Sequence, residues 1–232
     1  MLGNSIQRAK FSELFPVYLM GNQTYPADSA RNLGVVIDNN FNLKTHVNNI
    51  CKNCYYHIRD LRRIRKYLDL STATSLANAL VGSRLDYCNS LLYAVNSTYV
   101  TKLQRVQNCL ARTVTMSVRF SASKPLLDSL HWLPVRSRID FKLGLLVYKA
   151  FILGYPSYLA NLFKPRKYTM GLRVNHTKDI MPGPRSRTNY GEKSFLRAAP
   201  SIWNSLPAHI QSAESIMVFR KYLKTHLFTH PP

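Results

Sequence analysis

The sequence is 232 residues long and 46% hydrophobic, enough apolar material for one large or two small folded domains, which argues against wholesale disorder. It carries 32 Lys and Arg against 11 Asp and Glu, a formal net charge of +21. So many positive charges repel one another and destabilise a compact fold unless a bound polyanion neutralises them. Nucleic acid is therefore the first candidate partner and an anionic membrane the second. No two acidic residues are adjacent, which counts against a clustered-carboxylate magnesium site.

Residues 1–40 predict a small β-hairpin. Phe15–Met20 is followed by the turn-forming pair Gly21–Asn22, and Asn32–Asp38 contains three consecutive β-branched residues. Glycine and asparagine adopt the left-handed conformation that tight hairpin turns need, so we expect one hairpin over residues 15–38.

Residues 41–163 predict a bundle of helices. The first is long and amphipathic, because apolar residues recur three, four and seven positions apart: Leu43, Val47, Ile50, Cys54, Ile58, Leu61 and Leu68. Further helices are predicted from an N-cap at Ser71 to about Ser83, over about 84–95, from an N-cap at Ser97, and from a first turn containing Pro134 to about Leu153. The helix after Ser97 has an apolar face formed by Tyr99, Leu103, Val106, Leu110 and Val114.

Residues 164–191 interrupt this pattern. They hold three prolines and three glycines with little periodicity, which indicates a long basic loop or linker. The segment 192–232 predicts a last helix over about 213–228, capped by Ser212, with Ile216, Phe219, Leu223 and Leu227 on its apolar side. The predicted fold is mainly α: a helical bundle preceded by a small hairpin and followed by a basic loop and a C-terminal helix.

Positive charge is concentrated on faces of several predicted helices, away from their apolar faces. The candidate nucleic-acid-binding residues are Arg59, Arg62, Arg63, Arg65 and Lys66 on the first helix, Lys102, Arg105 and Arg112 on the fourth, and Arg138 and Lys142 on the fifth. Nine further cations lie within 164–197. Basic stripes of this kind suit a groove that follows a phosphate backbone, and solvated helix faces are the alternative.

The sequence predicts no metal site, cofactor or catalytic group. Four residues on one predicted helix resemble a zinc-ligand set: His46, Cys51, Cys54 and His57. The two histidines would lie about 16 Å apart at about 1.5 Å per residue, too far for one tetrahedral ion. Glycine-rich phosphate loops and nucleophile motifs are absent. Trp132 and Trp203 are expected to be packing anchors, with base stacking as the alternative.

The compartment predicted by the sequence is intracellular, nuclear or cytoplasmic, and not the secretory pathway. Four cysteines are too few for a disulfide framework, so reduced thiols are expected. The first twenty residues make a poor signal peptide. The most apolar long stretch, Leu143–Phe163, contains Lys149 and Pro156, so no membrane span or membrane partner is predicted.

Several stretches resemble the carboxy-terminal part of a LINE-type (non-LTR) retrotransposon reverse transcriptase of the jockey-like group. They are Leu33–Asp38, Leu61–Arg65, Ser83–Leu92, Leu103–Asn108, Leu130–Val135, Arg138–Lys142, Tyr190–Gly191, Ala198–Pro207 and Phe219–Phe228. The resemblance implies that 1–40 is a remnant of the hairpin at the end of the polymerase palm, near the primer, and that 41–163 is a thumb-like domain.

The resemblance also implies what this chain lacks. Reverse transcriptases of this family polymerise with palm aspartates, including an adjacent pair, that hold two Mg²⁺ about 4 Å apart. This sequence contains no Asp-Asp pair, and the fingers and most of the palm would precede Met1. We therefore expect no enzymatic activity.

The function expected from charge and resemblance together is non-specific binding of RNA or DNA by a truncated polymerase fragment. Two alternatives remain open. The chain is a non-functional relic that folds poorly without its palm, or it is an accessory subunit that supplies nucleic-acid affinity to a polymerase encoded elsewhere. The sequence does not indicate an oligomeric state.

Overall fold

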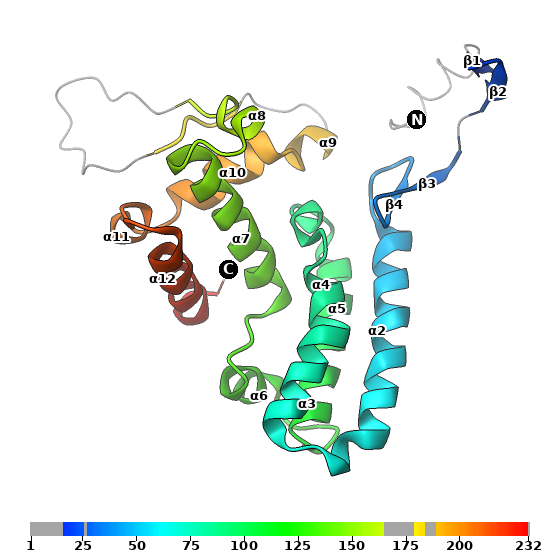
Figure 1. Cartoon of the computed structure of the whole chain (residues 1–232), viewed down its shortest axis with the longest axis vertical. Helices are drawn as coiled ribbons and strands as arrows, with labels where there is room; N and C mark the ends of the chain where they lie inside the picture. The colour runs from blue at the N-terminus through cyan, green and yellow to red at the C-terminus, as the bar shows by residue number, and fades with distance from the viewer. Residues whose placement is uncertain (1–15, 26, 165–178, 184–188, 232) are drawn as a thin grey trace.

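The computed structural model describes residues 16–25, 27–164, 179–183 and 189–231. It confirms a mainly helical fold with small antiparallel β-structure before the helices (Figure 1). The helices are α2 (Lys44–Ile64), α3 (Leu70–Ala77), α4 (Ser83–Asp86), α5 (Ser97–Val114), α6 (Ser123–Ser129), α7 (Val135–Val147), α8 (Ser157–Ala160), α9 (Asn189–Glu192), α10 (Phe195–Asn204), α11 (Ala208–Gln211) and α12 (Ile216–Thr229). Most of the predicted basic loop lies outside the described residues, including Arg166, Lys167, Arg173, Lys178, Arg185 and Arg187.

The predicted β-structure before the helices is confirmed, but in the described part of the chain residues 16–38 form two hairpins rather than one. Strand β1 (Val17–Leu19) pairs with β2 (Asn22–Thr24), and β3 (Ser29–Asn32) pairs with β4 (Val35–Asp38). Leu33 and Gly34, between β3 and β4, both have positive φ, as a two-residue hairpin turn requires. Each strand therefore pairs with its nearest neighbour in sequence.

The second hairpin is fixed to the helices by Asp38. Its carboxylate accepts hydrogen bonds from the backbone N–H groups of Asn40, Asn42 and Leu43 at 2.8–3.1 Å. This turn leads directly into α2, and it places a negative charge at the positive end of the helix dipole. The Tyr87 hydroxyl, at the end of α4, also donates to the carbonyl of Leu33 at 2.6 Å.

The boundaries of α2, α3 and α4 differ from the prediction. α2 ends at Ile64 and a 3₁₀ turn ends at Tyr67, so Leu68 is extended and not helical. Asp69, rather than Ser71, caps α3 by accepting from the backbone N–H groups of Ser71 and Thr72. A π-helical turn (Asn78–Gly82) joins α3 to α4, so the predicted break near Ser83 is wrong, as is the separate helix over 84–95.

The later helices agree with the prediction in their apolar faces and differ in their caps. Leu103, Val106, Leu110 and Val114 of α5 are buried as expected, while Asn96 and not Ser97 is its cap. α7 begins after Pro134 and continues through a π-helical turn, Tyr148–Ile152. The cap of α12 is Ser215 and not Ser212. The short helix α6 was not predicted.

Two hydrophobic cores meet along α7 and α10. The first is formed by residues of β4, α2–α5 and the first turns of α7, and the second by the end of α7 with α10, α11 and α12. In Figure 1, α7 runs between the α2–α5 group and α12. Different turns of α7 contribute to different cores, as Ile139 does to the first and Val147 to the second.

Both tryptophans are packing anchors, as predicted. Trp203 is fully buried and lies 5.9 Å, centroid to centroid, from Phe219, which stacks on Tyr148 at 4.4 Å. Trp132 is buried in the first core. Neither indole face is available to a base, so the alternative of stacking on these rings is wrong. No helix in the described part of the chain is long and apolar enough to cross a bilayer.

Candidate nucleic-acid interface

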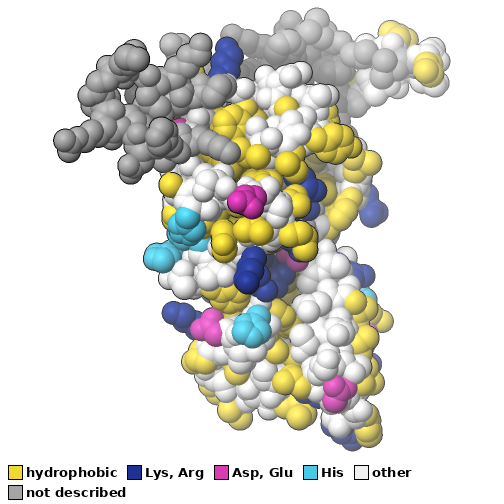
Figure 2. Space-filling model, turned by 60° about the vertical axis from the view of Figure 1, so that its left-hand side comes forward, with side chains coloured by type: hydrophobic (Ala, Val, Ile, Leu, Met, Phe, Trp, Pro, Cys, Tyr) yellow, Lys and Arg dark blue, Asp and Glu magenta, His cyan; other side chains and the backbone are white. Residues whose placement is uncertain are grey.

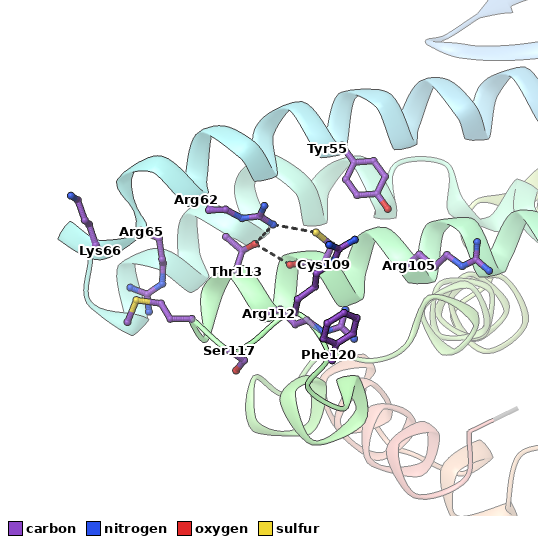
Figure 3. Close-up of a pocket in the computed structure, with 12 residues that line it drawn as sticks. Tyr55, Arg62, Arg65, Lys66, Arg105, Cys109, Arg112, Thr113, Ser117 and Phe120 are labelled. Atoms are coloured by element: carbon purple, nitrogen blue, oxygen red, sulfur yellow. Dashed lines mark hydrogen bonds between the residues drawn. The ribbon is translucent and has the colours of Figure 1, made fainter.

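A groove with a volume of about 790 Å³ lies between α2, α5 and the segment that follows α5 (Figure 3). We call it the α2/α5 groove. The residues that line it are Tyr55, Arg62, Arg65, Lys66, Arg105, Cys109, Arg112, Thr113, Met116, Ser117, Arg119 and Phe120. Six of these are Lys or Arg, and none of the described residues that line the groove is acidic.

Five of the ten predicted site residues come together in this groove. Arg62, Arg65 and Lys66 come from the end of α2 and the turn after it, while Arg105 and Arg112 come from α5. The pairing of α2 with α5 brings together residues about 50 positions apart in the sequence, as the 3.4 Å contact between Arg62 and Thr113 shows. The basic faces of two helices therefore form one surface.

Arg65 differs from the exposed cation that the sequence predicts. It is only 6% exposed, because its Nε donates to the carbonyl of Val114 and its Nη1 to that of Leu68, both at 2.6 Å. These carbonyls lie at the end of α5 and after the 3₁₀ turn. Arg65 thus joins the ends of α2 and α5, and its charge acts on the groove from below the surface.

Arg112 and Arg62 also contact the protein itself. Arg112 Nε donates to the carbonyl of Ser121 at 3.1 Å, and its Nη2 donates to Ser123 Oγ at 2.7 Å, so Arg112 holds the segment after α5. Arg62 Nη2 makes long contacts with Cys109 Sγ at 3.6 Å and Thr113 Oγ1 at 3.4 Å. The Arg62 side chain remains exposed, so it stays available to a ligand.

Three groove cations have no ion-pair partner among the described residues: Lys66, Arg105 and Arg119. All three are exposed. Figure 3 shows Lys66 at one end of the groove and Arg105 toward the other. With Arg62, they give four cations free to meet phosphates along the groove.

The remaining predicted cations of α2 and α5 lie outside the groove lining. Arg63 pairs with Asp60 at 3.4 Å, and the Arg59 guanidinium lies 5.4 Å from the ring centroid of Tyr56. Lys102 donates to Asn48 at 3.2 Å. The single basic cluster expected at 59–66 is therefore divided between the groove, the protein interior and the outer face of α2.

Arg138 and Lys142 line a different groove of about 520 Å³, the α7/α12 groove, together with Arg220 and Lys224 of α12. Arg138 pairs with Asp86 at 2.9 Å, which neutralises one charge of each sign. Figure 2 shows Lys and Arg side chains near the middle of the face on the α11/α12 side, below a broad hydrophobic area. This second basic surface has fewer cations than the α2/α5 groove and includes an acidic residue.

The neutral groups of the α2/α5 groove do not reduce its positive charge. Burial raises the pKa of the Tyr55 phenol, the thiols of Cys109 and Cys51 raise it further, and Arg105 lowers it. Burial also raises the pKa of the nearby Cys54 thiol to about 12. These groups are therefore protonated at neutral pH.

The structure does not gather His46, Cys51, Cys54 and His57, the four residues that resemble a zinc-ligand set in sequence, into a metal-binding group. Among the described residues, no three His, Cys, Asp or Glu side chains lie close enough together to hold a metal ion. Cys54 is fully buried in the first core, and His46 Nδ1 lies 3.5 Å from the backbone nitrogen of Val36. His46 thus lies at the junction of α2 with the second hairpin, and Cys54 has a packing role in the first core.

Sequence reasoning missed Tyr55, Arg119 and Phe120 as groove residues. Arg62 follows Tyr55 by seven positions, which is two helical turns, so both lie on the same face of α2. This spacing could have identified Tyr55 as a neighbour of the groove cations. Arg119 and Phe120 follow α5 in a segment without periodicity, so only the adjacency of a cation and an aromatic ring marked them.

Comparison of the chain with protein-family models, curated proteins and solved structures gives no match. The resemblance to LINE-type reverse transcriptases therefore stays a prediction.

Proposed function

We propose that this protein binds single-stranded or hybrid nucleic acid through phosphate contacts in the α2/α5 groove, without sequence preference and without catalysing polymerisation. The observation that carries the proposal is the lining of the groove. Six cations from α2, α5 and the segments that follow them line the groove, and none of the described residues that line it is acidic. Basic linings of this kind follow phosphate backbones because each contact releases a condensed counterion.

The distribution of ion pairs supports this ligand class. The four ion pairs among the described residues involve Arg63, Arg136, Arg138 and Arg197, and none of these arginines lines the α2/α5 groove. The groove therefore holds cations whose charge the described part of the chain does not balance. A polyanion supplies the missing charge, and its repeating phosphates match a row of cations better than a single small anion does.

Within this proposal, the α2–α7 bundle is the thumb-like part of a LINE-type reverse transcriptase, and the basic segment 164–191 contributes further positive charge to the chain. The protein works inside the cell, in the nucleus or cytoplasm, where RNA and DNA strands are accessible. An element of this kind grips template and primer and leaves the chemistry to palm aspartates.

Fluorescence anisotropy with a labelled oligonucleotide tests the proposal. Four free groove cations predict a slope of log K against log salt of about −2.8 for a single strand, at roughly −0.7 per contact. Oligonucleotides of different sequence are expected to bind with similar affinity, because phosphate contacts carry no base information. Absence of binding at low salt, or a flat salt response, would overturn the proposal.

A further inference from the structure

The segment between α5 and α6, residues 115–122, exposes apolar side chains beside the groove cations. We call it the 115–122 loop. Phe120 is 91% exposed, Val118 78% and Met116 64%. Phe120 and Met116 line the α2/α5 groove, as does Arg119, whose guanidinium lies 5.7 Å from the ring centroid of Phe120. An aromatic ring this exposed makes no contribution to either hydrophobic core.

The 115–122 loop is held in place from within. The backbone N–H of Ser117 donates to the carbonyl of Arg112 at 3.0 Å, and that of Ser121 donates to Val118 at 3.0 Å. The Arg112 side chain bonds both Ser121 and Ser123. Figure 3 shows Phe120 beside Arg112 on this loop. Because the loop is already braced, presenting the ring to a ligand has a low ordering cost.

We propose that Phe120 is a stacking platform for an unpaired nucleobase, so that the α2/α5 groove binds single strands in preference to duplexes. This inference rests on the proposed function and names its ligand more closely. Bases have apolar faces and stack on exposed aromatic rings whatever their identity, while neighbouring cations bind the phosphates. In a duplex the base faces are covered by adjacent base pairs, so a duplex gains only the phosphate contacts.

The charge around the ring favours a nucleic acid over an apolar protein partner. Phe120 stands within a lining of six cations, and Arg119 lies next to the ring. An apolar partner would have to desolvate these charges without compensation, whereas a single strand supplies both a phosphate and a base face. Stacking and charge together match one ligand chemistry, which RNA and DNA strands share.

Affinity for strands with and without bases tests the proposal. Phe120→Ala is measured against an oligothymidylate, an oligouridylate, an abasic strand with the same number of phosphates, and a duplex of equal length. We expect Phe120→Ala to weaken binding of the base-containing strands by roughly 5- to 150-fold, and to leave the abasic strand and the duplex within about twofold. If Phe120→Ala weakens binding of only the oligothymidylate or only the oligouridylate, the result would support the proposal and identify DNA or RNA, respectively, as the ligand.

Phe120→Trp provides a direct readout. The two natural tryptophans are buried, so the new indole is the exposed one among the described positions. Stacking of a base quenches its fluorescence, and an abasic strand does not. Tyr158→Ala, which removes an exposed aromatic ring from α8, is the matched control and is expected to bind like the unchanged protein.

Two results would overturn the inference while leaving the proposed function intact. One is equal affinity of the unchanged protein for base-containing and abasic strands. The other is a duplex that binds as tightly as a single strand while Phe120→Ala has no effect. Failure of every strand to bind at low salt would instead contradict the proposed function itself. Melting curves of each variant verify folding, which is expected to be unchanged because the ring is exposed.

Discussion

Removal of the free cations from the α2/α5 groove gives a quantitative test of where nucleic acid binds. The groove variant carries Gln in place of Lys66, Arg105 and Arg119, which are exposed and lack ion-pair partners among the described residues. With Arg62 they make four expected phosphate contacts, so the variant retains one. The salt slope for a single strand then falls from about −2.8 to about −0.7.

The loss of affinity follows from the same count. At about 0.1 M salt each phosphate contact contributes roughly 0.7 logarithmic units through counterion release, so the loss of three contacts weakens binding roughly 100-fold. The substituted side chains are exposed, so the melting temperature is expected to stay within a few degrees of the original.

A matched control removes the same charge from α2, at positions outside the groove lining. It carries Gln in place of Lys52, Arg59 and Arg63, which are exposed and do not line the groove. Anisotropy titrations at several salt concentrations compare the two variants with the unchanged protein. The control is expected to keep the original slope and most of the affinity. Equal losses in both variants would refute a docked strand and indicate diffuse attraction by net charge.

Three further predictions concern stability and chemistry. Asp140 is 7% exposed with one unpaired oxygen, and burial raises its carboxyl pKa against the effect of Arg136 at 3.7 Å. Because the folded pKa is the higher one, this carboxyl's contribution to stability is lost as pH rises through it. Asp140→Asn should therefore raise Tm by about 2–4 °C at pH 7 and not at pH 3, whereas a lower Tm at pH 7 would mean that the ion pair dominates. A Cβ at Gly144 would lie 2.9 Å from a methyl carbon of the buried Leu223. Gly144→Ala should therefore lower the free energy of unfolding in urea by about 1 kcal/mol, because overpacking costs more than the gain in helix propensity. A more stable variant would contradict this close approach. Primer extension with Mg²⁺ or Mn²⁺ should give no product, and a dNTP-dependent ladder would refute the non-catalytic assignment.

Periodicity predicted the long helices because each buries a continuous apolar face. The faces of α2 and α5 are visible in the spacing of Ile58 and Leu61 and of Leu103 and Val106. The helix starts were less predictable, because neighbouring polar residues compete as caps. Ser71 lies two positions after the true cap Asp69, and both side chains can accept a backbone N–H. α6 buries only Leu127, which leaves no pattern to detect.

The groove residues were predictable where helix geometry alone decides the direction in which a side chain points. Arg62 and Arg105 flank the apolar faces of their helices, and they do reach the groove. Arg65 follows Leu61 by four positions, which puts it on the apolar side, and this spacing already argued for burial. The roles of Arg119 and Phe120 depend on a loop whose path is set by Arg112, a tertiary contact without a local sequence signal.

The sharing of α7 and α10 between the two cores makes the chain one cooperative unit. Adjacent residues of α10 pack in different cores, Ala198 in the first and Ala199 in the second. A truncation after residue 163 would expose Tyr148 and remove Ala198 from the first core, although none of the described residues beyond 163 lines the α2/α5 groove. The C-terminal third thus stabilises the groove indirectly. Its described residues do not line the groove, yet Ala198 and Ile202 pack in the core that holds the groove helices together.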